Sequence, residues 1–415
     1  MNQGAHPRDP LTRRSFLGRA VSAGAVMSGA GALLAGCGLD SAALPKKTPL
    51  PEPRRPVVWP ILAANKPIAG GLPPEANATL KVLAWAHRLS HNCLEAFSKA
   101  YKCEIELTSY TSMAQALSIL RRRREQFDVF VGAPTEQIGP LVGRAQIQPL
   151  NHSYIPNIGE AWPVYTDPYY DSHWQYTVPY SVFTTGIAWR KDQVDLDPYA
   201  LANGWEFPWR AAIKGKTAVL DDYRATIGLA LLKDNDDQLN STDPYLLNRA
   251  RDALFDLDGL VDLRINNQTV SELADGRSSV HHAWSGQVVA AAKKLPRGVP
   301  DDVLGYWFPP DGAGPVANDT MTILRHAGNP VLSHLFLNFM LDRHNALTNI
   351  AATGFTQPLT YATPSRLVQL GILPSSLTST AVMSTFLDRG LKELQITPAG
   401  NLLWQQAWNA VRQHA

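Results

Sequence analysis

The sequence predicts an α/β fold built from two lobes, and three observations lead to it. From residue 79 onward, short apolar strand patterns alternate with helical patterns, which favours parallel sheets covered by helices. The chain has 415 residues, enough for two domains behind an N-terminal leader. The β-rich passage "YTVPYSVFTTGIAWR" (176–190) has a proline in its middle and is long enough to cross from one lobe to the other.

The first half of the chain shows the alternation most clearly. "LKVLAW" (80–85) is a short apolar strand, and "HNCLEAFSKAYK" (91–102) is a helix because Leu94, Phe97 and Tyr101 share one face. The same alternation continues through a strand at 103–110, a helix at 112–124, a strand at 127–132 and a short helix within 134–146.

A second round of strands and helices follows the crossing passage. "GKTAVLDDYRATIGLALL" (215–232) is a strand and then a helix, and "PYLLNRARDALFDL" (244–257) is a further helix. "SSVHHAWSGQVVAAAKKL" (278–295) is a strand, a turn and a helix, "DTMTIL" (319–324) is another strand, and helix-rich segments finish the chain.

The N-terminus has the pattern of an export signal. Arg13 and Arg14 precede a mildly apolar run, which indicates the twin-arginine route, although an ordinary signal with adjacent arginines is the alternative. The tetrad "LAGC" (34–37) resembles the lipobox of bacterial lipoproteins, in which the cysteine thiol takes the lipid. We therefore expect residues 1–36 to be removed and Cys37 to be lipidated, which would hold the protein on the outer face of the cytoplasmic membrane.

Residues 37–78 are rich in proline and predict an extended tether between the lipid and the folded body. The part at 57–72 is more apolar, so whether it packs on the body is left open. Cys93 and Cys103 are separated by a helix that would hold them about 15 Å apart. A disulfide needs α-carbons within about 7 Å, so we expect two unpaired cysteines, with Cys103 in the core.

Composition and motifs argue against several classes of function. The chain has 38 basic and 36 acidic residues, so it has no basic field for nucleic acid. "GKT" (215–217) lacks the glycine that a phosphate loop needs at position 210, where Arg210 stands. His281 and His282 are adjacent on a strand and point to opposite faces, so they cannot bind one metal ion. No catalytic residue, metal or cofactor is expected, and an exported hydrolase built on "AWSGQ" (283–287) is the least favoured alternative.

Polar and aromatic residues gather in the turns that follow the expected strands. These turns read "AWAHR", "VGAPTE", "LDDYRA", "AWSGQ" and "AND". In open α/β sheets, ligands bind outside the carboxyl ends of the strands. Five turns of this kind in an exported two-lobed protein favour a ligand cleft, and therefore a binding protein rather than an enzyme.

The stretches "LEAFSKAYKCEIELTSY", "YTVPYSVFTTGIAW", "GKTAVLDDYRATIGLAL", "HHAWSGQVVAA" and "ATGFTQP" together resemble the periplasmic spermidine/putrescine-binding proteins of bacterial ABC importers. The resemblance runs from Leu80 to the C-terminus. It implies a two-lobed (type II) periplasmic binding protein fold with the ligand in a cleft between lobes joined by crossing segments. Lobe one would take residues 79–184 and 320–364, and lobe two residues 185–319 and 365–415.

The resemblance also implies a function and a site. The family holds polyamine ammonium groups with carboxylates and encloses the methylene chain between aromatic rings. A monomer that binds spermidine or putrescine and delivers it to permease and ATPase subunits is therefore expected, with no nucleic-acid partner. The matching positions in this chain are Trp85, Asp222, Trp284, Asp319, Phe355 and Gln395.

Four positions depart from the family's pattern. Ala225 replaces a second acid, Ala317 replaces an aromatic residue, and Thr135 and Arg88 each replace a tyrosine. A positive charge beside an ammonium group is unfavourable. If Arg88 points into the cleft, an amino-acid-like solute, a phosphonate or another zwitterion becomes the alternative ligand.

Overall fold

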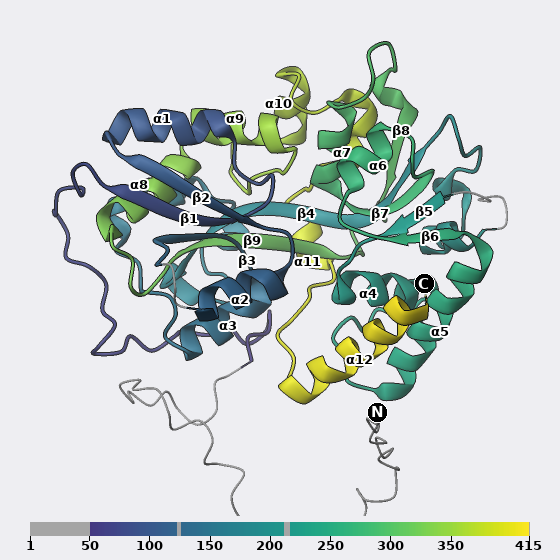
Figure 1. Ribbon diagram of the computed structural model, residues 1–415, viewed down its shortest axis with the longest axis horizontal. Helices are drawn as coiled ribbons and strands as arrows, with labels where there is room; N and C mark the ends of the chain where they lie inside the picture. The colour runs from purple at the N-terminus through teal and green to yellow at the C-terminus, as the bar shows by residue number, and fades with distance from the viewer. Residues whose placement is uncertain (1–49, 123–125, 211–215, 415) are drawn as a thin grey trace, which may run out of the picture. The chain divides into compact units, whose positions relative to one another are not determined.

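The computed structural model describes residues 50–122, 126–210 and 216–414 (Figure 1). The expected signal and lipidation positions, Arg13, Arg14 and Cys37, lie outside the described residues.

Nine strands of the described chain form one sheet that runs through both lobes, in the order β2-β1-β3-β9-β4-β7-β5-β6, with β8 beside β4. Parallel strands β1, β2 and β3 make up one end and parallel strands β5, β6 and β7 the other. The bounds are β1 (Thr79–Trp85), β2 (Glu104–Tyr110), β3 (Val129–Pro134), β4 (Thr177–Arg190), β5 (Lys216–Val219), β6 (Asp262–Ile265), β7 (Val280–Trp284), β8 (Leu304–Trp307) and β9 (Val316–Ile323). The predicted α/β class is confirmed.

Strand β4 joins the two halves of the sheet. Its first part, Thr177 to Thr184, pairs with β9, and its second part pairs with β7 on one side and β8 on the other. All 14 of its residues are buried, which explains the nearly unbroken apolar and threonine-rich sequence. The register with β9 shifts between Pro179 and Ser181, because proline has no N–H to donate to the ladder.

Helices cover both faces of the sheet in each lobe (Figure 1). In lobe one, α1 (His91–Tyr101), α8 (Pro330–Leu341) and α9 (Arg343–Thr353) lie on one face, and α2 (Met113–Arg122) and α3 (Thr135–Gly143) lie on the other. In lobe two, α6 (Thr269–Ala274) and α7 (Ser285–Ala292) face α4 (Tyr223–Lys233), α5 (Pro244–Leu260) and α12 (Pro398–His414) across the sheet. Two short helices, α10 (Pro364–Gln369) and α11 (Phe386–Arg389), complete the fold.

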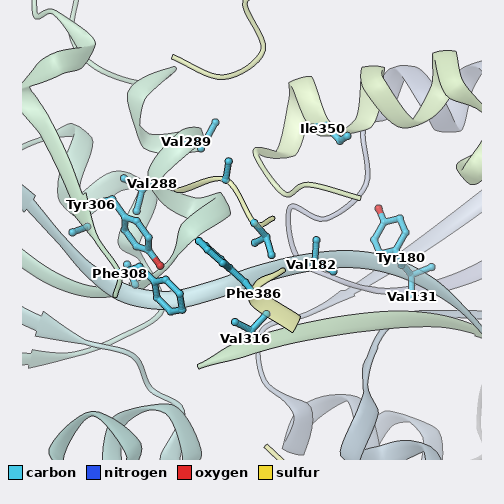
Figure 2. Packing of buried hydrophobic residues seen from close by; sticks show 14 of the residues in the cluster. Val131, Tyr180, Val182, Val288, Val289, Tyr306, Phe308, Val316, Ile350 and Phe386 are labelled. Carbon is cyan, nitrogen blue, oxygen red and sulfur yellow. The ribbon is translucent and has the colours of Figure 1, made fainter. Parts of the chain in front are cut away.

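The hydrophobic core extends along β4 into both lobes. Figure 2 shows Tyr180, Val131 and Ile350 at one end of this cluster and Tyr306 and Phe308 at the other, with Val182, Val316 and Phe386 between them. The last predicted strand begins three residues earlier than expected, at Val316, because Val316 to Asn318 pair with Val182 to Thr184 of β4.

The proline-rich segment is not a free tether along its whole length. Val57 and Trp59 are buried, the Val57 N–H donates to the Tyr169 carbonyl at 2.9 Å, and Trp59 Nε1 donates to the Tyr170 carbonyl at 2.8 Å. Asn65 Nδ2 donates to the Ile147 carbonyl. The part of the expected tether (37–78) that contains Val57, Trp59 and Asn65 therefore packs on lobe one, because burial of the apolar side chains is favourable.

The two cysteines and two histidines are core residues. Cys93 and Cys103 are buried and unpaired, as predicted from their spacing. His281 and His282 on β7 are also buried, and burial lowers their pKa values to about 4 and about 3, so both are neutral. In the described parts of the chain, no helix has the length and apolar character needed to cross a bilayer.

Candidate functional site

The parallel strands of the two lobes point toward each other. Strands β1 and β3 end at Trp85 and Pro134, and Pro134 pairs with Asp319 of β9. Strand β7 ends at Trp284, which pairs with Thr185 in the middle of β4. The turns after these strands and after β5 line a cavity of about 170 Å³. The predicted position of the site, at the carboxyl ends of the strands, agrees with this geometry.

Asp222 is held in the cavity wall by its role as the N-cap of α4. Its Oδ1 accepts hydrogen bonds from the backbone N–H groups of Arg224 and Ala225, at 3.0 and 3.1 Å. Burial raises the pKa of the Asp222 carboxyl, and the two backbone hydrogen bonds partly offset that rise. The cap fixes the direction of this carboxylate before any ligand arrives.

Aromatic rings from both lobes meet at the cavity. Trp85 of lobe one and Trp284 of lobe two contact each other edge to face, with ring centroids 5.6 Å apart. Phe183 of β4 packs against both Trp284 and Phe355, at 6.1 and 5.7 Å. Trp85, Trp284 and Phe183 line the cavity, and Phe355 is buried directly behind them.

The Arg88 side chain also points into this region. The sequence had left its direction open. The side chain lines the cavity, and Nη1 lies 3.3 Å from Asp319 Oδ2. Nη1 also donates to Ser181 Oγ, and the guanidinium carbon lies 3.3 Å from the centre of the Phe355 ring. Asp319 was expected to be a free acid for a ligand, but the structure pairs it with Arg88.

Burial opposes the charged forms of this pair, while each partner stabilises the other. Burial raises the pKa of Asp319, and the nearby guanidinium of Arg88 counteracts the rise. Burial likewise lowers the pKa of Arg88, and the Asp319 carboxylate counteracts that shift. Because the two groups compensate each other, the ion pair can persist without any ligand.

Two further acids line the cavity that the sequence analysis did not select. Glu136 is in the first turn of α3 in lobe one, and Glu393 lies in the segment that precedes α12. Burial and the neighbouring Glu393 carboxylate raise the pKa of Glu136 to about 8. Burial, with a contribution from Asp222, raises the pKa of Glu393 to about 7, although Arg224 opposes the shift. Among the described residues these carboxyls form no ion pair, although Arg224 and Lys392 also line the cavity. We call the part of the cavity lined by Glu136, Asp222 and Glu393 the acidic end.

The sequence pattern indicates that Glu136 lies near the site, but it does not indicate this for Glu393. Glu136 directly follows the turn "VGAPT" at the end of a predicted strand, where ligand-binding residues collect. Glu393 lies in an irregular segment, and nothing in its local sequence indicates that it returns to the cavity.

Gln395 was expected in the site, and the structure places it elsewhere. Its side chain lies against Gly139 of α3, next to the Trp59 ring, and is not among the residues that line the cavity. Glu393, two residues earlier, lines the cavity instead. Side chains two residues apart point the same way in a regular strand. Residues 392–397 form neither helix nor strand, so Glu393 can line the cavity while Gln395 does not.

The other positions that depart from the expected pattern also lie at the cavity. Thr135, Ala225 and Ala317 all line it. Ala225 and Ala317 supply neither the acid nor the ring expected there. Glu136 and Glu393 provide carboxylates that the sequence pattern did not assign.

Metal binding and serine chemistry were the other functions that the residues of this region could have offered. Among the residues that the structure describes, no group of three His, Cys, Asp or Glu side chains could hold a metal ion. The Ser285 hydroxyl, at the start of α7, accepts a hydrogen bond from the Thr184 backbone N–H at 3.2 Å. That bond is structural and ties α7 to β4.

Comparison with known proteins decides the family. Residues 92–369, more than half of the chain, match the model of the family described as bacterial extracellular solute-binding protein. The chain belongs to this family. Its members are solute-binding proteins, in agreement with a cavity between the two lobes.

Curated relatives cover most of the folded body. The chain is 26% identical over 293 residues to a putrescine/cadaverine-binding protein of Pseudomonas aeruginosa, an alignment that covers 69% of this chain and 82% of that protein. It is 25% identical over 283 residues to spermidine/putrescine-binding periplasmic protein 1 of Haemophilus influenzae, covering 68% and 75% of the two chains.

Solved structures share the fold. A spermidine/putrescine ABC transporter substrate-binding protein from Streptococcus pneumoniae superposes with a TM-score of 0.65 at 18% identity, covering 81% of this chain and 99% of that one. A lipoprotein of Treponema pallidum gives a TM-score of 0.68 at 20% identity, covering 80% and 99%. The expected two-lobed periplasmic binding protein fold is confirmed.

Proposed function

We propose that this family member is an exported, lipid-anchored receptor that binds a small organic cation of the polyamine class, such as putrescine or spermidine. It delivers that solute to the permease and ATPase subunits of an ABC importer. The observation that carries the proposal is that Glu136 of lobe one, Asp222 of lobe two and Glu393 line one cavity between aromatic walls.

The electrostatics of the cavity explain how a cation would be held. Burial raises the pKa values of all three carboxyls, Glu393 adds to the rise at Glu136, and Asp222 adds to the rise at Glu393, so the ligand-free site resists full ionisation. An ammonium group among them removes that repulsion and offsets its own loss of water. Aromatic faces such as those of Trp85 and Trp284 add about 0.5–2 kcal/mol of cation–π attraction.

The same arrangement links binding to closure of the lobes. Glu136 and Asp222 belong to different lobes, and a cation between them attracts both. A ligand shifts a hinge equilibrium only by its differential affinity for the two states, and contacts to both lobes exist only in the closed state. Lobe one comprises residues 79–184 and 320–364, lobe two comprises residues 185–319 and 365–415, and the closed monomer is the form that the permease recognises.

The names of relatives support the ligand class. The curated relatives from Pseudomonas aeruginosa and Haemophilus influenzae are named for putrescine, cadaverine and spermidine. In this proposal the protein performs no chemistry on its solute and needs no cofactor.

Export and anchoring follow from the N-terminal sequence pattern. Residues 1–36 serve as a twin-arginine signal through Arg13 and Arg14, and Cys37 receives the lipid. In cells fed labelled palmitate, the wild-type protein should carry the label and Cys37→Ala should not. Replacing Arg13 and Arg14 by lysine should leave unprocessed protein in the cytoplasm, and normal export of that variant would contradict the assigned route.

Arg88 favours a second candidate ligand. Because its guanidinium lines the cavity, a zwitterion could place its amine among the acids and its carboxylate near Arg88. This candidate requires Arg88 to exchange Asp319 for a ligand carboxylate. The existing ion pair, together with Phe355 stacked on the guanidinium, makes that exchange costly.

A ligand panel tests the proposed function. The chain carrying Cys37→Ala should be melted with putrescine, cadaverine, spermidine, amino acids, phosphonates and sugars. An amine at a hundred times its Kd should stabilise the protein by about 2.7 kcal/mol, and Glu136→Gln with Asp222→Asn should abolish the shift. Stabilisation by phosphonates or sugars but by no amine would refute the ligand class.

A further inference from the structure

Arg88 lies in surroundings suited to a bound cation. Its guanidinium carbon is 3.3 Å from the centre of the Phe355 ring, 5.0 Å from that of Phe183 and 5.9 Å from that of Trp284. The Asp319 carboxylate lies 3.3 Å from Nη1. Aromatic faces around a desolvated positive charge, with one carboxylate as counter-ion, are the features that recognise an ammonium ligand. We call these four side chains, Phe183, Trp284, Asp319 and Phe355, the aromatic box.

The turn that carries Arg88 is tightly held. The Arg88 carbonyl accepts hydrogen bonds from the Tyr180 hydroxyl and from Asn349 Nδ2, and the Arg88 N–H donates to the Trp85 carbonyl at 3.2 Å. Arg88 is only 3% exposed. These contacts come from β4 and α9 as well as from the end of β1, so the fold fixes the backbone of the turn, and Asp319 and Ser181 hold the guanidinium in the box.

Three other carboxyls, those of Glu136, Asp222 and Glu393, line the cavity together with two basic side chains, Arg224 and Lys392. The positive charge of Arg224 opposes the rise in pKa of Glu136 and Glu393, but its Nη2 donates to the Leu239 carbonyl and to Asn240 Oδ1. Its guanidinium also stacks on Trp404 at 4.7 Å. Lys392 Nζ donates to the Leu387 and Gly390 carbonyls. Within the described chain, Glu136, Asp222 and Glu393 therefore form no ion pair, while Asp319 is already neutralised by Arg88.

The cavity that these groups share is small. The cavity volume of about 170 Å³ compares with about 150 Å³ for a protein cavity that accepts a benzene-sized molecule. A four- or five-carbon diamine has a similar number of heavy atoms. A triamine is longer, and its additional ammonium group would meet the guanidinium of Arg88.

We propose that Arg88 is a specificity-determining residue: it fills the aromatic box as a built-in cation, so that the pocket selects a short diamine and rejects spermidine. This inference rests on the proposed function and adds a limit on the length and charge of the ligand that the pocket accepts. The acids at 136, 222 and 393 bind the diamine, and the box is closed to a further ammonium group.

The test compares ligand preference before and after Arg88 is removed. Isothermal titration of the Cys37→Ala chain with putrescine, cadaverine, spermidine and spermine gives the preference of the native pocket. We expect the diamines to bind at least tenfold more tightly than spermidine. The change Arg88→Gln frees Asp319 and the rings, so the affinity for spermidine should rise at least tenfold relative to the affinity for putrescine.

Two matched variants separate this effect from general damage. Arg190 is another buried arginine with an acidic partner, Asp192, and it does not line the cavity, so Arg190→Gln should leave the preference unchanged. In the double variant Arg88→Gln with Asp319→Asn the box has no counter-ion, so the gain for spermidine should disappear. If Arg88→Gln is too unstable to titrate, its melting temperature should rise more with spermidine than with putrescine.

Each outcome bears on one of the two proposals. A native pocket that binds spermidine as tightly as diamines, with a ratio that Arg88→Gln does not change, overturns the role of Arg88 and leaves the polyamine function intact. Binding of no amine by the native protein overturns both. Tighter binding of γ-aminobutyrate than of putrescine, lost in Arg88→Gln, shows that Arg88 receives a carboxylate and also overturns the inference.

Discussion

Arg88 Nη1 lies 3.3 Å from Asp319 Oδ2, and the two side chains are only 4% and 8% exposed. The pair joins the turn after β1 to the strand β9 that lies beside β4. A buried ion pair contributes little net stability relative to apolar residues, but loss of one partner leaves an uncompensated charge in the core.

Replacing only one residue of the Arg88–Asp319 pair should therefore lower the free energy of unfolding more than replacing both. We expect Asp319→Ala to lower the free energy of unfolding by about 3–5 kcal/mol, because Arg88 would remain buried and unpaired. Arg88→Met combined with Asp319→Ala should recover most of that loss. Urea denaturation followed by tryptophan fluorescence measures both, and a cost below about 1 kcal/mol for Asp319→Ala would contradict the buried pairing.

Glu136 and Glu393 should be necessary for ligand affinity although neither was expected from the sequence. Each change to glutamine removes a carboxyl that can ionise beside the bound amine and keeps the side chain's size. We expect amine affinity to fall at least tenfold per change, since each removes a charge-assisted contact worth about 1.5–3 kcal/mol. Glu95→Gln, on the exposed surface of α1, is the control. Unchanged titrations for both variants would remove these acids from the site.

The acidic end should make stability depend on pH. The folded-state pKa values of Glu136 and Glu393 are about 8 and about 7, above the ordinary glutamate value of about 4.5. Such groups contribute their full stability below the unfolded pKa and lose it as pH rises through the folded values. The ligand-free protein should therefore become less stable between pH 5 and pH 8.5. The loss of stability should be smaller in the double variant Glu136→Gln with Glu393→Gln. If the free energy of unfolding of both proteins changes equally with pH, these two carboxyls are not its cause.

Ligand binding should show the opposite trend with pH. An ammonium group binds the ionised carboxylates, so affinity should rise with pH up to about 8, by at most about tenfold per pH unit for each carboxyl that must ionise. The amine itself stays protonated in this range, since primary amines titrate near 10. Titrations at pH 6, 7 and 8 measure the trend, and constant affinity would show that these carboxyls are already charged.

Asp222 has a structural and a functional role that can be separated. Asparagine is also a good N-cap, so Asp222→Asn should keep stability within about 0.5 kcal/mol and still weaken amine binding. Asp222→Ala loses the cap as well and should cost about 1 kcal/mol more. Thermal melts and titrations of both variants distinguish the roles. Full ligand affinity in Asp222→Asn would leave the residue as a cap only.

Trp59 tests whether the second part of the proline-rich segment belongs to the folded body. Its ring is 2% exposed and its indole N–H donates to the Tyr170 carbonyl. Trp59→Ala should destabilise the protein by about 3–5 kcal/mol, the usual cost for a buried aromatic residue. Val58→Ala, at the exposed neighbouring position, should have almost no effect. If Trp59→Ala and Val58→Ala have the same melting temperature, the segment is a tether throughout.

Local pattern was sufficient for the elements and for part of the site. Period-two and helical spacing located the strands and most helices, because alternation of buried and exposed residues is a local property. The rule that ligands gather at the carboxyl ends of strands selected the turns that contain Trp85, Asp222 and Trp284, and the resemblance to the family named these residues; all three line the cavity. The helix between Cys93 and Cys103 likewise excluded a disulfide from spacing alone.

The charge balance of the cavity was decided only by the tertiary structure. Whether Arg88 meets a ligand or Asp319 depends on contacts between segments far apart in the chain, and Glu393 reaches the cavity through an irregular segment that no periodicity describes. Coulomb and desolvation energies depend on distance and burial in three dimensions. The sequence determined which residue types are present, and packing of the two lobes decided which acids remain free.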